Sequence, residues 1–104
     1  MNNFTIEQWM IDGLRLKGNE LIIFALLYNL LKYNNNCMQV SNVAISKILR
    51  LNYKTVFTMI ESLVNKEFIT KENIYYPNGV RAPNSYTINK EKIRQQCGGL
   101  EGLE

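Results

Sequence analysis

The stretch "SNVAISKILRLNYKTVFTMIESLV", residues 41–64, contains two helical patterns separated by a short break. Ser41 is a favourable N-cap for the first helix, and Asn52 is a favourable N-cap for the second, which extends to about Lys66. The first helix has four apolar residues on one face, Ala44, Ile45, Ile48 and Leu49. Two short helices joined by a tight break predict a helix-turn-helix.

The second helix, residues 52–66, has one apolar face and one polar face. Its apolar residues lie three and four positions apart: Val56, Met59, Ile60, Leu63 and Val64. On a wheel of 100° per residue, the opposite side holds Lys54, Thr58, Glu61 and Asn65. Tyr53 and Phe57 fall at the border, and a place in the core is the structural alternative for Phe57. The exposed stripe therefore begins with Lys54 and Thr58. The acidic Glu61 is expected to limit contact with an anion to the first two turns.

Helices are predicted before this pair. A short helix around Trp9, with Thr5 as its cap, follows the alternating residues 4–6. The strongest helical pattern begins after Gly18 with Asn19 as N-cap, is apolar almost all round, and ends in the asparagine run 34–36. Such a helix is expected to be buried on more than one side.

Strands and turns are predicted on both sides of the pair. The residues 37–41, 68–70 and 74–76 have strand character, and "SYTI", residues 85–88, alternates as a return strand after the turn "PNG", residues 77–79. A last short helix is expected over residues 89–96. The fold class is therefore mainly α (α+β): a winged helix-turn-helix whose helices pack with a small antiparallel β-wing. The domain is predicted to span residues 1–96, with 97–104 a disordered tail or a cloning remnant.

Composition favours one cytoplasmic binding domain. The chain has 104 residues, 46% of them hydrophobic and 20% charged, with a net charge of +3. Residues 41–60 carry three cations and no acid, so the net positive charge falls on the helix pair. No signal peptide is visible, and the most apolar run, "LIIFALLYNLLKY", is too short to span a bilayer. Cys37 and Cys97 are expected to be reduced thiols, with a disulfide as the alternative.

An enzyme is not expected. The chain has no histidine, which removes the commonest general acid or base and the usual imidazole ligand of zinc. The nine acidic residues are scattered, and no glycine-rich loop for phosphate is present. We therefore expect no catalytic residues, no cofactor and no metal.

The first turns of the second helix are the candidate contact with double-stranded DNA, because a helix-turn-helix places that end in the major groove. Lys54 is suited to a phosphate or a guanine edge, and Thr58 to a base edge or a thymine methyl group. Asn52 and Thr55, with the free backbone N–H groups, are suited to a phosphate, and Tyr53 to a phosphate through its hydroxyl.

Three further cations complete the candidate set. Lys47 lies in the basic block, Arg50 can reach a phosphate from the turn, and Arg81 suits a narrow minor groove from the wing, residues 75–84. Taken singly, each of the eight residues also has a structural explanation, since an asparagine caps any helix and a surface lysine is usually only solvated. The prediction of DNA contact therefore rests on the occurrence of these residues together on the helix pair and the wing.

Three segments resemble a known family. "FTIEQWMIDGLRLKGNELIIFALLYNL", "AISKILRLNYKTVFTMIESLVNKEFI" and "NSYTIN" are similar to the N-terminal winged-helix domain of phage replisome-organiser proteins and related DnaD-type replication proteins. The resemblance implies a sequence-specific module that binds replication origins, often as a dimer or higher oligomer. It also implies that contacts with other replication proteins lie in a separate C-terminal region, which is missing here.

The chain departs from many such relatives at two positions. Arg50 and Glu67 stand where those relatives carry glycine. Both positions are therefore expected to require a backbone conformation that glycine adopts more easily than arginine or glutamate. The matched contact positions vary in such families, so the resemblance predicts where contact occurs and not which bases are read.

Two other functions remain open. A protein-interaction or oligomerisation module is favoured by the modest net charge, by Glu61 and by the apolar segment Trp9-Met10-Ile11. If this segment is exposed, it forms a natural dimer surface. A transcriptional regulator that senses a small molecule is compatible with the fold class, although the chain has no obvious ligand-binding addition.

Overall fold

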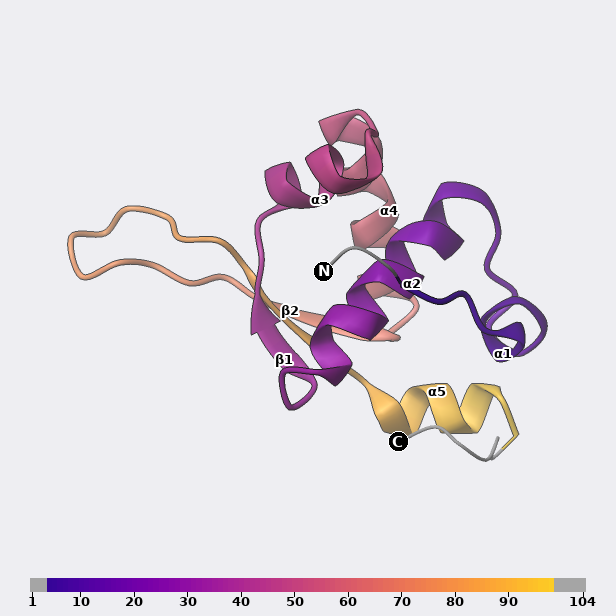
Figure 1. Ribbon diagram of the computed structural model, residues 1–104. Helices are drawn as coiled ribbons and strands as arrows, with labels where there is room; N and C mark the ends of the chain where they lie inside the picture. The colour runs from indigo at the N-terminus through magenta and orange to yellow at the C-terminus, as the bar shows by residue number, and fades with distance from the viewer. Residues whose placement is uncertain (1–3, 99–104) are drawn as a thin grey trace.

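The predicted helix-turn-helix is present in the computed structural model, which describes residues 4–98. Within those residues the order of elements is α1 (Gln8–Asp12), α2 (Gly18–Lys32), β1 (Cys37–Gln39), α3 (Asn42–Leu49), α4 (Tyr53–Asn65), β2 (Ile69–Glu72), β3 (Ser85–Ile88) and α5 (Lys90–Gln96). Figure 1 shows α3 and α4 on one side of α2, α5 on the other, and a long hairpin arm that projects from the sheet. The predicted fold class is confirmed.

Both helices of the pair begin at the predicted caps. The Ser41 hydroxyl accepts a hydrogen bond from the Ala44 N–H at 3.0 Å, and the Asn52 side-chain oxygen accepts one from the Lys54 N–H at 2.7 Å. These bonds satisfy one otherwise unpaired N–H group at each helix start.

The helix ends require a left-handed backbone. Arg50 closes α3 with φ 55° and ψ 43°, and Glu67 follows α4 with φ 68°. Left-handed geometry at a helix end is most easily adopted by glycine, and these are the two positions where the resemblance led us to expect it. The strain expected at Arg50 and Glu67 is therefore supported by the backbone.

The three strands form one antiparallel sheet in the order β1-β3-β2. Tyr86 of the central strand β3 pairs with Met38 on one side and Lys71 on the other. Tyr86 and Ile88 are buried, so every second residue of β3 faces the helices. The sheet thus joins the wing to the helical core.

The wing continues beyond the sheet as an arm, residues 73–84 (Figure 1). Its turn is as predicted: Gly79 has φ 88°, its N–H donates to the Tyr76 carbonyl at 2.8 Å, and the Asn78 side chain accepts from the Val80 N–H. The predicted strand over 74–76 is wrong, because this part of the arm holds only an isolated bridge, between Tyr75 and Arg81. Two backbone hydrogen bonds flank it, from the Tyr76 N–H to the Val80 carbonyl and from the Ala82 N–H to the Ile74 carbonyl, both at 2.8 Å. The side chains from Tyr75 to Arg81 are exposed, so no packing holds this part in a continuous ladder.

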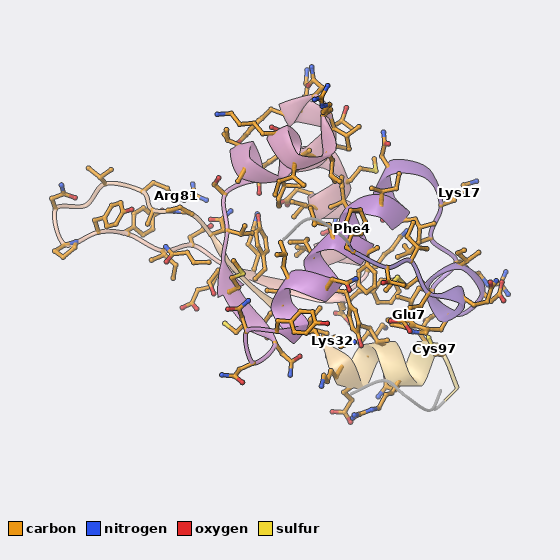
Figure 2. The ribbon with its side chains drawn as sticks, in the orientation of Figure 1. Phe4, Glu7, Lys17, Lys32, Arg81 and Cys97 are labelled. Carbon is orange, nitrogen blue, oxygen red and sulfur yellow. The ribbon has the colours of Figure 1, made fainter. Side chains whose placement is uncertain are left out.

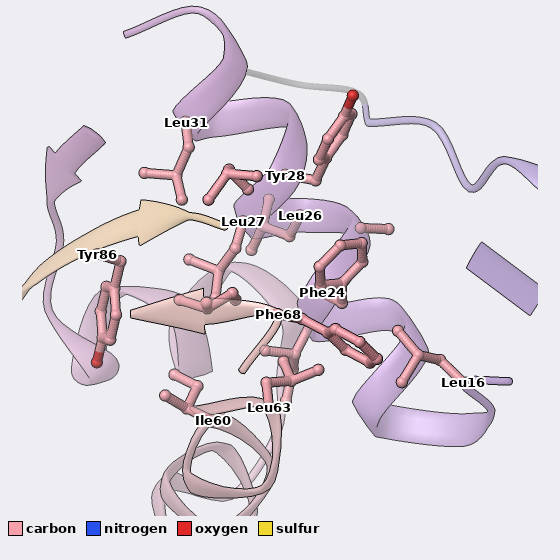
Figure 3. Close-up of a cluster of buried hydrophobic side chains, with 14 of the residues drawn as sticks. Leu16, Phe24, Leu26, Leu27, Tyr28, Leu31, Ile60, Leu63, Phe68 and Tyr86 are labelled. Carbon is pink, nitrogen blue, oxygen red and sulfur yellow. The ribbon is translucent and has the colours of Figure 1, made fainter. Parts of the chain in front are cut away.

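The core forms where α2 meets α4 and the sheet. Figure 3 shows Phe24, Leu27 and Leu31 of α2 with Ile60 and Leu63 of α4, and with Phe68 and Tyr86 from the sheet side. Residues 23–29 of α2 are all buried, which confirms that this helix is covered on more than one side. Within that run Asn29 satisfies its amide by donating to the Ala25 and Thr5 carbonyls.

Three local predictions are wrong. Thr5 does not cap α1, because the helix begins at Gln8 and its cap position is Glu7, two residues after Thr5. Asn19 does not cap α2, because the helix already begins at Gly18, after Lys17. Ile48 is 54% exposed, although the next residue, Leu49, packs against the core, so Ile48 does not belong to the inward face of α3.

Candidate nucleic-acid interface

The first two turns of α4 have an exposed face with two parallel rows of side chains. Lys54 and Thr58 form one row and are exposed, as the wheel predicted. Tyr53 and Phe57 form the other row and are 49% and 47% exposed. The alternative that Phe57 belongs to the core is wrong, because the face with Val56 at its centre is the one that packs inward.

The three cations of the helix pair are unpaired within residues 4–98. Lys47, Arg50 and Lys54 are exposed, and none of their side chains contacts a carboxylate among the described residues. Three other lysines of the described chain are paired with acids, in the pairs Lys66–Glu20, Lys71–Glu61 and Lys92–Glu67. The charge of the helix-turn-helix is therefore available to an external anion.

Glu61 does not repel an anion in the way that the sequence suggested. Its carboxylate accepts a hydrogen bond from the ammonium group of Lys71 on β2. The acid is therefore neutralised within the fold.

A groove lies between the start of α3, the first turns of α4 and the base of the wing. Its volume is about 270 Å³. Of the eight predicted contact residues, it brings together Tyr53 and Arg81, from elements distant in sequence. The other six, Lys47, Arg50, Asn52, Lys54, Thr55 and Thr58, do not line it but belong to the same helix pair and its caps.

Arg81 lies partway along the arm, between its turn and the sheet (Figure 2). One guanidinium nitrogen donates to the side-chain oxygens of Asn73 at 2.8 Å and Asn84 at 3.0 Å. The guanidinium also lies 5.9 Å from the centre of the Tyr75 ring. Because both hydrogen-bond acceptors are neutral, Arg81 is held in place without losing its positive charge.

A hydrogen-bonded chain that the sequence did not reveal ties the wing to the helix pair. The buried Tyr86 hydroxyl donates to the Asn42 side chain at 2.6 Å and accepts from Asn84 at 3.4 Å. Burial raises the pKa of Tyr86, so it stays a neutral donor at physiological pH. Alternation in "SYTI" indicates that Tyr86 faces inward, but nothing in the sequence pairs it with Asn42.

The N-terminal segment is less exposed than the dimer hypothesis required. Met10 is fully buried, and the ring of Trp9 packs edge-on against Phe24 and Tyr28. Only Ile6 and Ile11 of this region remain exposed, at 43% and 41%. Of the predicted apolar segment only Ile11 of α1 is therefore exposed, with Ile6 preceding the helix.

The two cysteines are free thiols, so the disulfide alternative is wrong. Hydrogen bonds from Ser85 and Thr87 lower the pKa of the Cys37 thiol, and burial raises that of Cys97. Cys97, Glu7 and Trp9 line an open cleft of about 800 Å³ between α1 and α5 (Figure 2). Residues 4–98 contain no group of three histidine, cysteine or acidic side chains arranged to hold a metal.

The predicted tail at 97–104 lies mostly outside the described residues, since α5 ends at Gln96 and the description ends at Gly98. Among the described helices, none has the length and apolar character that crossing a membrane requires.

Comparisons with known proteins support the fold and go no further. No family model and no curated protein matches the chain. A solved structure described as a possible transcriptional regulator from Methanosarcina mazei Go1 is similar, with a TM-score of 0.61 and 20% identity. The match covers 94% of this chain and 84% of that one, so it includes nearly all of the described elements. At this identity the likeness concerns the fold.

Proposed function

We propose that the chain is a sequence-specific module that binds double-stranded DNA. The first turns of α4 enter the major groove, and the wing, residues 75–84, lies on the backbone or in the minor groove. The proposal assigns contacts to the eight residues predicted from the sequence. It assigns no catalytic role, cofactor or metal to the chain.

The unpaired cations of the helix pair carry this proposal. Lys47, Arg50 and Lys54 stand on consecutive parts of α3, the turn and α4, and no acid of residues 4–98 neutralises them. DNA presents phosphates at regular spacing, and each cation that neutralises one releases a condensed counterion. A row of unpaired cations at the start of the second helix fits this polyanion.

The backbone at the start of α4 supports the same orientation. The first intrahelical bond is donated by Val56 to the Asn52 carbonyl, and the Asn52 side chain satisfies the Lys54 N–H. The N–H groups of Tyr53 and Thr55 have no partner within the described residues. They are free to bind a phosphate at the positive end of the helix dipole.

Replication initiation in a phage or plasmid is the biological role that we propose. It rests on the sequence resemblance to replisome-organiser proteins. In that role the module works as a homodimer or higher oligomer, with Ile6 and Ile11 as candidate contacts, and other replication proteins bind a C-terminal region beyond this chain. Transcriptional regulation is the second candidate, because the similar solved structure is described as a possible transcriptional regulator.

Duplex binding measured over a range of salt concentrations tests the DNA-binding proposal. Log K is expected to fall against log salt with a slope of about 0.9 for each phosphate neutralised. Replacing Lys47, Arg50 and Lys54 together by alanine should remove about three of these contacts. A matched variant that removes Lys17 and Lys90, which lie outside the helix pair, should keep the slope. Absence of duplex binding at low salt would contradict the proposal.

The positions of selected sites separate the two roles. Duplexes recovered from a random pool define a binding sequence, which is then located in the genome that encodes the chain. Repeated sites clustered in one locus that sustains plasmid replication favour replication initiation. Single sites that overlap promoters favour regulation. Light scattering of the chain with and without a selected duplex measures the oligomeric state.

A further inference from the structure

The surface proposed to face DNA has an apolar part that its cations do not explain. Tyr53 and Phe57 lie one turn apart on α4, and Val43 at the start of α3 is 49% exposed. All three line the groove beside the wing. An exposed phenylalanine among exposed apolar neighbours loses the stabilisation of burial, so such a cluster indicates a contact with a partner.

The charge around the groove decides which partner fits. Arg81, with its charge retained, lines the wall formed by the wing, and Lys71 beside it is already paired with Glu61. Lys54 is exposed on the adjacent row of α4. The occupant must therefore combine an apolar contact with nearby negative charge. At about 270 Å³ the groove is smaller than the usual site of a drug-sized ligand.

The major groove of DNA offers this combination at one base. Thymine carries a C5-methyl group on its major-groove edge, and the phosphate backbone lies alongside. No other standard base presents an apolar group there. A phenyl ring offers no hydrogen bond to a base edge or to a phosphate, so the methyl group is the feature that Phe57 can distinguish.

We propose that Phe57, with Tyr53 beside it, is a specificity-determining residue that reads thymine methyl groups in the major groove. The inference rests on the proposed DNA-binding function and adds the chemical feature that the module recognises. Lys54 and Thr58, on the neighbouring row, then contact polar edges or phosphates. The two rows divide the recognition of one segment of the groove between apolar and polar features.

Replacing thymine by deoxyuridine tests the inference because it deletes only the methyl group. The probe is a duplex selected from a random pool, with its thymines replaced one at a time. Binding is expected to weaken about fourfold at one or two positions, which corresponds to the burial of one methyl-sized group. The Phe57→Ala variant should bind the thymine duplex and the uracil duplex equally, and the dependence of its binding on salt should be unchanged.

Two controls keep the result interpretable. Tyr33→Ala removes an aromatic side chain that is 75% exposed at the end of α2 and does not line the groove, so it should leave the thymine preference intact. Circular dichroism and thermal unfolding establish that Phe57→Ala is folded. Because Phe57 is half exposed, its removal should leave the fold unchanged.

The outcomes separate this inference from the proposed function. Salt-dependent duplex binding with equal affinity for thymine and uracil at every position overturns the inference and leaves DNA binding in place. Discrimination that persists in Phe57→Ala also overturns it. Tighter binding to the single strand than to the duplex assigns the aromatic pair to base stacking and overturns it too. Absence of duplex binding overturns both.

Discussion

The two halves of α4 belong to one continuous helix but differ in what surrounds them. In the first two turns the outward side chains, Tyr53, Lys54, Phe57 and Thr58, are exposed. In the last two turns two polar side chains are held within the fold, although Asn65 is exposed: Glu61 pairs with Lys71, and the Ser62 hydroxyl donates to Glu20 at 2.6 Å.

The difference shows how one helix serves two purposes. The inward face is buried along its whole length, at Val56, Ile60 and Leu63, so the helix is fixed to α2 and the sheet at both ends. In the second half, Glu61 and Ser62 have partners on other elements, whereas Lys54 and Thr58 in the first half have none within the described residues. We interpret the second half as the anchor of the helix and the first half as the part left open to a partner.

The largest expected effect is a loss of stability when the core contact of the second half is truncated. Leu63 is fully buried among residues of α2 and the sheet (Figure 3). Leu63→Ala should lower the free energy of unfolding by about 2–5 kcal/mol, because it removes buried apolar surface and leaves a cavity. Denaturant unfolding measures this as a lower midpoint at constant m.

Phe57→Ala is the matched variant in the open half. It should lower the free energy of unfolding by less than about 1 kcal/mol, since the ring is 47% exposed. Equal losses in the Phe57 and Leu63 variants would show that the two halves are not distinguished by burial, and would remove the basis of the comparison.

Lys54→Ala tests the open half through binding. Its ammonium has no acidic partner within residues 4–98, so stability should change by less than about 0.5 kcal/mol. Selected duplexes should bind more weakly. If Lys54 reads a guanine edge, the variant should lose about 1–3 kcal/mol of discrimination between guanine and the other bases at one base pair. If it contacts a phosphate, binding weakens equally for all sequences and the salt slope falls by about 0.9.

The reciprocal control for Lys54 is Lys66, at the end of α4. Lys66 is held by Glu20 at 2.9 Å, and its removal should leave duplex affinity within about twofold. A loss of affinity in Lys66→Ala as large as that in Lys54→Ala would contradict the division of the helix into an anchor and an open half.

Glu20→Gln tests the anchor without creating a cavity. The Glu20 carboxylate is largely buried, with 13% of its side chain exposed, and accepts from both Ser62 and Lys66. The amide keeps the shape but loses the charge-assisted bonds, so unfolding should become easier by about 1 kcal/mol. Glu67→Gln, where the pair with Lys92 spans 3.7 Å and the acid is 69% exposed, should change stability by less than about 0.5 kcal/mol.

The helix-turn-helix and its caps were predictable because their signals are local. Ser41 and Asn52 act on N–H groups within three residues, and the apolar spacing of α4 reports one face directly. The failures at Thr5 and Asn19 concern the exact residue at which a helix starts: α1 begins three residues after Thr5, and α2 begins one residue before Asn19. Local patterns do not contain that information.

The candidate site was only partly predictable for the same reason. The sequence located the exposed cations, since a charged residue on the polar face of a helix is expected at the surface whatever the rest of the fold is. It did not locate Phe57 on the surface, because a border position becomes core or surface according to which neighbours pack there. It also missed the pairing of Glu61 with Lys71, which joins a helix to a strand ten residues away.

The smallest expected effects come from the two left-handed residues that enclose α4. Arg50 and Glu67 have φ values of 55° and 68°, which glycine adopts without the steric cost that other residues incur. Arg50→Gly and Glu67→Gly should each raise the free energy of unfolding by about 0.5 kcal/mol, after allowance for the greater freedom of glycine in the unfolded chain. Thermal unfolding should shift upward by about 2–4 °C in both.

The two glycine variants should differ only in DNA binding. Arg50 is exposed and unpaired in the turn before the open half, so its loss should weaken duplex binding and lower the salt slope by about 0.9. Glu67 follows the anchored half, and its replacement should leave the slope unchanged. Because both variants gain the same stability from a relaxed left-handed backbone, any difference in DNA affinity between them is caused by the loss of the arginine side chain. An equal fall in both would instead assign the effect to the shape of the turns.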